Sequence, residues 1–127
     1  MIRVMLVDDQ TLVRQGVRSL LALSSDIEVI AEAPDGQTAV EQIPEVKPDV
    51  VLLDMRMPGM TGVELLEKLH TLDCLPSYKI LITGGLDEQA EVNELLDGDL
   101  QFDLVLNKPF SRRELARHLK LLFESAS

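Results

Sequence analysis

The chain has 127 residues, of which 46% are hydrophobic, and a formal net charge of -10 at pH 7. This length fits one compact domain, and the hydrophobic content is sufficient for a buried core. Nucleic acids are bound through basic clusters and aromatic stacking, so the acidic balance and an aromatic content of 3% argue against direct binding of DNA or RNA.

The sequence also indicates the cellular compartment of the protein and the extent of its domain. The single Cys74 cannot form an internal disulfide, and no Cys or His cluster has zinc-ligand spacing. No signal peptide precedes the first strand, and no apolar run approaches the roughly 20 residues of a membrane span. We therefore expect a soluble, cytoplasmic protein without a membrane partner. Residues 1–124 are expected to form the domain and 125–127 a tail, with no output domain in this chain.

Strand-like and helix-like segments alternate along the chain, with Pro44, Pro48 and Pro76 between them. The predicted elements, in chain order, are strand Ile2–Val7, helix Thr11–Leu23, strand Ile27–Ala33, helix Gly36–Ile43, strand Val50–Leu53, helix Thr61–Leu72, strand Lys79–Ile82, a helix near 87–96, strand Leu104–Leu106, and a last helix opened by a Ser111–Glu114 capping box. Helical spacing predicts inner faces formed by Val13, Val17, Leu20 and Leu21, by Leu65, Leu66, Leu69 and Leu72, and by Leu115, Leu119 and Leu122.

Five strand–helix units with right-handed crossovers predict an α/β fold, a (βα)5 three-layer sandwich. The expected sheet is parallel and flavodoxin-like, with strand order 2-1-3-4-5. Ligands of such sheets bind beyond the carboxyl ends of the strands, where the strand order reverses. The first and third strands flank that crevice.

Three acids follow these two strands: Asp8 and Asp9 after IRVMLV, and Asp54 after DVVLL. Gathering three carboxylates costs Coulomb energy unless a cation or a proton relieves it. A divalent metal site is the natural inference, with Mg²⁺ or Mn²⁺ as the hard cation. Asp9, Asp54 and the backbone carbonyl of Arg56 can supply the protein ligands.

The fourth and fifth strands contribute two further polar groups to the same edge. Thr83 ends the run KILIT, and Lys108 follows LVLN. A hydroxyl and an ammonium can bind phosphoryl oxygens, and a carboxylate can attack phosphorus to give a mixed anhydride. The set therefore points to phosphoryl transfer.

Together, LVDD, VLLDMRMPGMTG, ILITG and NKPF resemble, in order and over essentially the whole chain, the receiver domain of bacterial two-component response regulators. The resemblance implies that Asp54 is the phosphoacceptor and Asp9 a direct metal ligand, while Asp8 reaches the metal through water. Thr83 resembles the switch hydroxyl and Lys108 the phosphate-binding lysine. Pro109 resembles a proline that follows a cis peptide bond, and Arg56 and Gly85 resemble the residues flanking the path of the attacking water.

The segment DDQTLVRQGVRSLL is most similar to regulators with a LuxR-type helix-turn-helix output, whereas KPFSRREL resembles other receiver subfamilies.

The chain departs from the family pattern at Val105, which occupies the position of the usual switch aromatic. Phe102 is a secondary candidate for that role. The connection between Thr83 and Lys108 is also about three residues longer than is usual in the family.

The resemblance implies a histidine kinase or histidine phosphotransfer protein as partner. It also suggests a homodimer through the helix near 87–96, the fifth strand and the last helix. Residues 84–107 contain seven acids and no Lys or Arg, whereas the last helix carries Arg112, Arg113, Arg117 and Lys120. Two independently solvated faces are the alternative.

Three other functions remain open at this point. A phosphohydrolase with an aspartyl-phosphate intermediate would need a general acid two residues after the nucleophile, where this chain has Arg56. A flavodoxin-like cofactor carrier would need a phosphate-binding loop in place of DDQTLV. A degenerate receiver acting by protein contacts alone would not need Asp54, Thr83 and Lys108. The leading hypothesis is a signalling receiver that is not a turnover enzyme.

Overall fold

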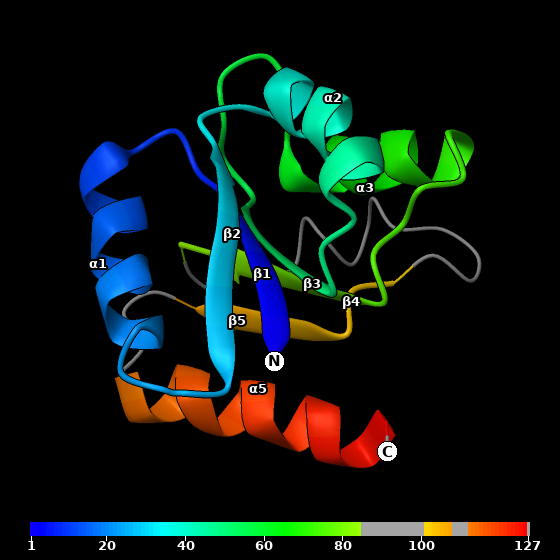
Figure 1. Cartoon of the computed structure of the whole chain (residues 1–127). Coiled ribbons are helices and arrows are strands. Elements are labelled where there is room, and N and C mark those ends of the chain that lie inside the picture. Colours follow the sequence, from blue (N-terminus) through cyan, green and yellow to red (C-terminus); the bar gives the residue numbers. More distant parts are fainter. Residues whose placement is uncertain (85–100, 108–111, 127) are drawn as a thin grey trace.

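A parallel five-stranded sheet forms the centre of the protein, and its strand order is β2-β1-β3-β4-β5 (Figure 1). The computed structural model describes residues 1–84, 101–107 and 112–126. The observed order confirms the predicted topology. The strands are β1 (Ile2–Val7), β2 (Ile27–Ala33), β3 (Val50–Asp54), β4 (Tyr78–Thr83) and β5 (Leu104–Asn107).

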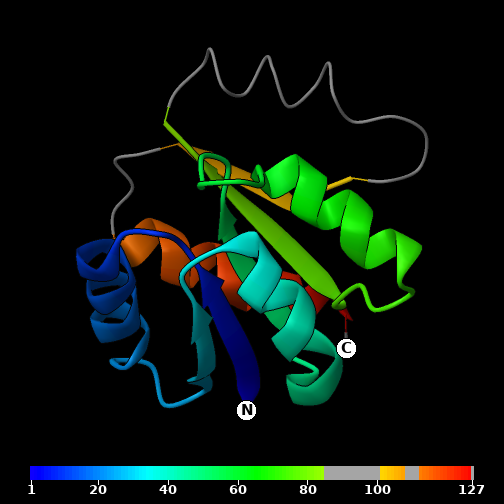
Figure 2. The same ribbon diagram turned by 90° about the horizontal axis from the view of Figure 1, so that it is seen from above.

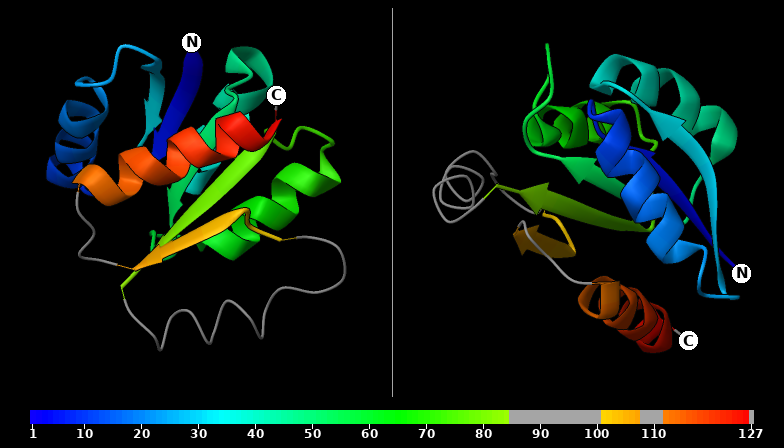
Figure 3. Two further views of the ribbon diagram at one scale, coloured as in Figure 1. Left: turned by 90° about the horizontal axis from the view of Figure 1, so that it is seen from below. Right: turned by 90° about the vertical axis from the view of Figure 1, so that its left-hand side faces the viewer.

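Helices cover both faces of this sheet. Figure 1 and Figure 2 show α1 and α5 on one face and α2 and α3 on the other, and Figure 3 shows α5 crossing beneath the sheet with its first residues beside α1. Within the described ranges, no helix is long and apolar enough to cross a membrane. The helix predicted near 87–96 lies outside those ranges. The helices are α1 (Thr11–Leu21), α2 (Gly36–Val46), α3 (Gly62–Thr71) and α5 (Arg112–Ala126).

The central strands are mainly apolar because each of their faces is buried against helices. On β1, Val4 and Leu6 pack into the core beneath α1 and α5, whereas Met5 and Val7 pack into the core beneath α2 and α3. Neighbouring side chains of a strand point to opposite faces, so one continuous apolar run supplies both cores. Because β1 is packed on both faces, the position of its C-terminal end, which carries Asp8 and Asp9, is held by the two cores.

Helix α2 extends past Ile43, the end predicted from the sequence, and contains Pro44. A proline inside a helix lacks the N–H that would continue the hydrogen-bond ladder. Here the last turn is held from outside, because the Arg3 guanidinium donates to the carbonyls of Val46 (2.8 Å) and Lys47 (2.7 Å). Lys47 itself ends the helix in the left-handed conformation, with φ of 52°.

Two other helix boundaries differ from the prediction. Helix α1 ends at Leu21, and Leu23 beyond it is 64% exposed. Leu72, predicted on the inner face of α3, is the residue that caps its C-terminus and is 49% exposed, so that prediction was wrong. The other three predicted leucines of α3 are buried, as are Leu115 and Leu119 of α5.

Candidate phosphoryl and metal site

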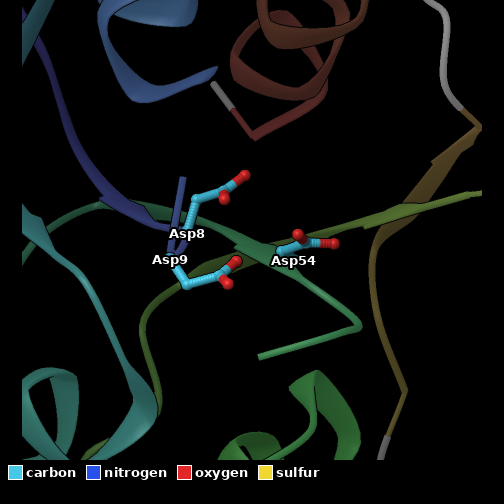
Figure 4. A group of neighbouring side chains, drawn as sticks. All are labelled: Asp8, Asp9 and Asp54. Atoms are coloured by element: carbon cyan, nitrogen blue, oxygen red, sulfur yellow. The ribbon is translucent and has the colours of Figure 1, made fainter. Parts of the chain in front are cut away.

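Asp8, Asp9 and Asp54 meet at the carboxyl edge of the sheet, as predicted. The neighbouring strands β1 and β3 pair Val7 with Leu53, so the acids that follow stand at the same level. Their carboxylate oxygens all lie within 4.8 Å of one another (Figure 4). Asp8 and Asp54 are each 5% exposed, whereas Asp9 is open to solvent. The group is thus buried at Asp8 and Asp54 and accessible to solvent at Asp9.

The turn after β1 holds Asp8 from several directions. Its N–H donates to the carbonyl of Ala33 (3.1 Å), and its carboxylate accepts the N–H of Gln10 (2.8 Å). The guanidinium of Arg14, one turn into α1, donates to the backbone carbonyl of Asp8. Glu32 on β2 lies 3.4 Å from Arg14 Nε and forms an ion pair with it. Arg14 therefore helps to hold the turn that carries Asp8 and Asp9.

The chain after Asp54 is fixed to the neighbouring strand and to α3. The N–H of Met55 donates to the carbonyl of Ile82, and the N–H of Gly62 donates to the carbonyl of Met55, both at 3.0 Å. The N–H of Arg56 faces Asp54 Oδ1 at 3.4 Å. These bonds hold the backbone of residues 54–56 at the site, where the carbonyl of Arg56 was predicted to act as a ligand.

Two glycines make this loop possible. Gly59 adopts a φ of +78°, a conformation that glycine tolerates without steric cost. Gly62 starts α3 against the sheet, since a Cβ there would lie 2.9 Å from the carbonyl oxygen of Asp54.

Thr61 caps α3 by accepting the N–H of Glu64 (3.1 Å), and the Glu64 carboxylate accepts the N–H of Thr61 in return (3.3 Å). This capping box was present in the sequence as TGVE and was not predicted.

Thr83 ends β4 beside Asp54, because β3 and β4 pair Asp54 with Ile82. Its side chain is fully buried, and its hydroxyl donates to Oδ1 of Asn107 at the end of β5. Val105 and Phe102 are half-buried against the core beneath α2 and α3. Lys108, Pro109 and Gly85, which the sequence assigned to the site, lie outside the described residues.

The donor set fits a small hard divalent cation. Opposite ligands of Mg²⁺ lie about 4.2 Å apart, since each Mg–O distance is about 2.1 Å. Carboxylate oxygens that lie within 4.8 Å of one another are therefore close to that spacing. Within the described part of the chain, this is the group of three acidic, His or Cys side chains that could hold a metal ion.

The family model for the response regulator receiver domain matches residues 4–120. The chain belongs to the response regulator receiver family. It is 44% identical over 97 residues to transcriptional regulatory protein LnrK of Bacillus subtilis, covering 76% of this chain and 43% of LnrK. It is 34% identical to the response regulator protein VraR of Staphylococcus saprophyticus, covering 99% of this chain and 58% of VraR. The receiver domain thus spans about half the length of these curated relatives.

Solved structures support the same assignment. The signal receiver domain of the putative response regulator NarL from Mycobacterium tuberculosis superposes with a TM-score of 0.79 at 32% identity, covering 94% of this chain and 93% of that one. A DNA-binding response regulator of the LuxR family from Staphylococcus aureus gives a TM-score of 0.80 at 28% identity, covering 94% and 97%. The resemblance of the receiver domain to LuxR-type regulators is therefore confirmed.

Arg14 and Asn107 contact the predicted site residues Asp8 and Thr83 and were not themselves predicted from the sequence. Arg14 is separated from Asp8 by five residues, and the first turn of α1 returns it to the acids. Asn107 stands immediately before Lys108 and is brought to Thr83 by the register of β4 and β5. Asn107 directly follows the predicted strand Leu104–Leu106, and a polar residue at that place was the available signal.

Proposed function

We propose that this receiver domain accepts a phosphoryl group on the carboxylate of Asp54 and acts as a phosphorylation-controlled switch. The observation that carries the proposal is the meeting of Asp8, Asp9 and Asp54, two of them buried, at one edge of the sheet. Carboxylates whose oxygens lie within 4.8 Å of one another repel, and a bound cation would offset that repulsion, so a binding role accounts for their placement better than stability does. Family membership supports the same role.

In the proposed reaction, an oxygen of Asp54 attacks the phosphorus of a phosphohistidine donor. The bond from phosphorus to the imidazole nitrogen breaks, the nitrogen keeps the electron pair, and an acyl phosphate forms on Asp54. The donor is a histidine kinase or a histidine phosphotransfer protein, by analogy with the family. Thr83 and Lys108 would bind the phosphoryl oxygens and stabilise their redistributed charge.

Asp9, Asp54 and the carbonyl of Arg56 would hold Mg²⁺ or Mn²⁺ directly, with Asp8 acting through water. Bound there, the cation would neutralise charge on the transferring group. Asp9→Asn should weaken Mg²⁺ binding by roughly tenfold or more, because it replaces an anionic ligand. Asp26→Asn makes the same charge change at an exposed position at the other end of β1 and should leave Mg²⁺ affinity unchanged. Equal effects of the two substitutions would exclude a local metal site.

The proposed domain organisation is a receiver over residues 1–124 followed by a tail at 125–127, in a chain that spans about half the length of its curated relatives.

A weak phosphorylation-dependent homodimer is also proposed. It is supported by the exposed Arg113, Arg117 and Lys120 on α5 and by the acidic composition of residues 84–107. Sedimentation with beryllofluoride should show a dimer that loosens in salt and in the Arg113→Glu, Arg117→Glu double variant. A monomer at all concentrations would contradict it.

Acetyl phosphate with Mg²⁺ tests the central proposal, because it can donate to Asp54 without a kinase. Intact-mass spectrometry should show one phosphoryl adduct that EDTA prevents and Asp54→Asn eliminates. Asp26→Asn should label like the wild type. Absence of any adduct would favour a receiver acting by protein contacts alone, and continuous release of phosphate with many turnovers would favour a phosphohydrolase.

A further inference from the structure

The hydroxyl of Thr83 is engaged by a residue for which the proposed function gives no role. Thr83 and Asn107 are the paired last residues of the neighbouring strands β4 and β5. The Thr83 hydroxyl donates to Oδ1 of Asn107. Thr83 is fully buried, whereas Asn107 is exposed. A buried proton donor is thus held by an acceptor that borders solvent.

A hydroxyl carries a single proton and can donate it to one acceptor at a time. If Thr83 is to donate to a phosphoryl oxygen on Asp54, it must first release Oδ1 of Asn107. The two acceptors therefore compete for one proton. The released carboxamide oxygen can turn to water, because Asn107 is exposed, so breaking the bond does not leave a buried acceptor unsatisfied.

We infer that Asn107 is a positioning residue that holds the Thr83 hydroxyl in the resting arrangement and sets how readily the phosphorylated arrangement forms. This inference rests on the proposed function, since it assigns the Thr83 hydroxyl to Asn107 in the resting state and to a phosphoryl oxygen in the phosphorylated state. Val105 lies two residues earlier on the same side of β5 and has no polar group. A hydrogen-bonded connection from Thr83 to β5 therefore runs through Asn107, next to the proposed phosphate-binding Lys108.

Removing the competing acceptor should favour the phosphorylated arrangement. A neutral hydrogen bond contributes on the order of 1 kcal/mol net, which corresponds to about fivefold in an equilibrium constant. Asn107→Leu keeps the approximate shape of the side chain without an acceptor, and Asn107→Ala removes both. Both variants should bind beryllofluoride, in saturating Mg²⁺, about fivefold more tightly than the wild type, whereas their affinity for Mg²⁺ alone should not change.

Asn107 takes part in a further interaction, so a double-mutant cycle is needed to isolate its bond to Thr83. In a Thr83→Val background the hydroxyl is absent, so Asn107→Leu should leave beryllofluoride affinity unchanged. Calorimetric titration of the wild type, the two single variants and the double variant provides the four dissociation constants. The inference predicts an effect of Asn107→Leu in the presence of the hydroxyl and none in its absence.

The outcomes separate this inference from the proposed function. If the wild type binds beryllofluoride and Asn107→Leu and Asn107→Ala bind it no more tightly, the inference is overturned while the phosphoacceptor role stands. An equal gain with and without the Thr83 hydroxyl would also overturn it, since the effect would then come from another contact. If the wild type binds no beryllofluoride in Mg²⁺, the proposed function fails and the inference fails with it. Circular dichroism and thermal melts confirm that each variant is folded.

Discussion

Gly62 lies so close to Asp54 that a Cβ at position 62 would stand 2.9 Å from the Asp54 carbonyl oxygen. The same Cβ would lie 2.6 Å from Cδ1 of Leu81, which is fully buried. Both separations are shorter than normal van der Waals contact. The start of α3 is thereby packed directly onto the backbone of the proposed phosphoacceptor.

Gly62→Ala should therefore destabilise the fold by about 1–3 kcal/mol, the usual cost of an overpacked core position. Chemical denaturation measures that free energy of unfolding. Because relief of the clash must displace Asp54 or Leu81, the affinity for Mg²⁺ should fall as well. A variant as stable as the wild type would show that α3 does not pack as closely as the structure indicates.

Gly16 offers a matched control within α1. An added Cβ there meets nothing within 4 Å, and the residue is exposed on the helix. Alanine is the better helix former by about 1 kcal/mol, so Gly16→Ala should raise stability by an amount of that order. Opposite signs for the same chemical change at the two positions are the expected result.

Arg14 should affect Mg²⁺ binding at the proposed metal site through the turn that carries Asp8 and Asp9. Its side chain is 13% exposed, against 58% for Arg18, although both form an ion pair with Glu32. Arg14→Ala removes the donor to the Asp8 carbonyl and should weaken Mg²⁺ binding by roughly tenfold, as loss of a supporting contact usually does. Arg18→Ala removes a similar charge but no contact to Asp8, and its affinity for Mg²⁺, measured by calorimetry, should match the wild type.

Two effects oppose each other in that experiment. Removing a cation near the site favours Mg²⁺, while loosening the turn disfavours it. Glu32, which is shared with Arg18, offsets part of the Arg14 charge, and the Arg14 guanidinium donates directly to the Asp8 carbonyl, so loosening should dominate. Tighter Mg²⁺ binding in Arg14→Ala would show that its charge outweighs its structural role.

The N-terminal cap of α2 should make stability depend on pH. Asp35 accepts the N–H of Thr38 at 2.7 Å, and this backbone hydrogen bond lowers the pKa of the Asp35 carboxyl below its ordinary value. A depressed pKa in the folded state means that the stabilisation is complete above the unfolded pKa and is lost as pH falls through the folded pKa. The wild type should exceed Asp35→Ala in Tm at neutral pH, and this difference should shrink below about pH 4.

Asp35→Asn distinguishes the capping hydrogen bond from the carboxylate charge, because asparagine also caps helices and does not titrate. Its Tm advantage over Asp35→Ala should be nearly constant across the same pH range. A wild-type advantage that is equally constant would contradict the assigned pKa shift.

Arg56 should govern how long the proposed phosphoryl group persists. It is exposed, two residues after Asp54, with its backbone tied to the site. Its side chain is long enough to cover the phosphoryl group, whereas Gly85, the other residue assigned to the water path, has no side chain to orient a water. Slow self-dephosphorylation is expected, and Arg56→Asn should accelerate it severalfold, a barrier change on the order of 1 kcal/mol. An unchanged or slower rate of phosphate release would contradict shielding.

Most of the sheet could be predicted because its central strands are buried on both faces and so consist mainly of apolar runs. Helix ends were less predictable, because tertiary contacts decide them. Pro44 favours a helix end, and the reach of Arg3 across to Val46 and Lys47 explains why α2 continues. Leu72 fits the apolar spacing of α3 but falls at its C-terminal cap, where the chain turns away from the core.

The acids of the site were predictable because they directly follow strands whose order the pattern fixes. Arg14 and Asn107 were not, since each acts through a contact to a neighbouring strand or turn that carries no signature of its own. The capping box of Thr61 and Glu64 is a different case, because its spacing was visible in the sequence. Contacts that depend on register or on side-chain reach thus require the structure.

Locating the phosphoryl group in the chain tests the proposed phosphoacceptor role of Asp54 most directly. After treatment with acetyl phosphate and Mg²⁺, borohydride reduces an acyl phosphate of aspartate to homoserine, and peptide mass spectrometry identifies the converted position. We expect conversion at Asp54, dependent on Mg²⁺, with Asp8 and Asp9 unchanged. Conversion at Asp8 or Asp9, or equal conversion when EDTA replaces Mg²⁺, would contradict it.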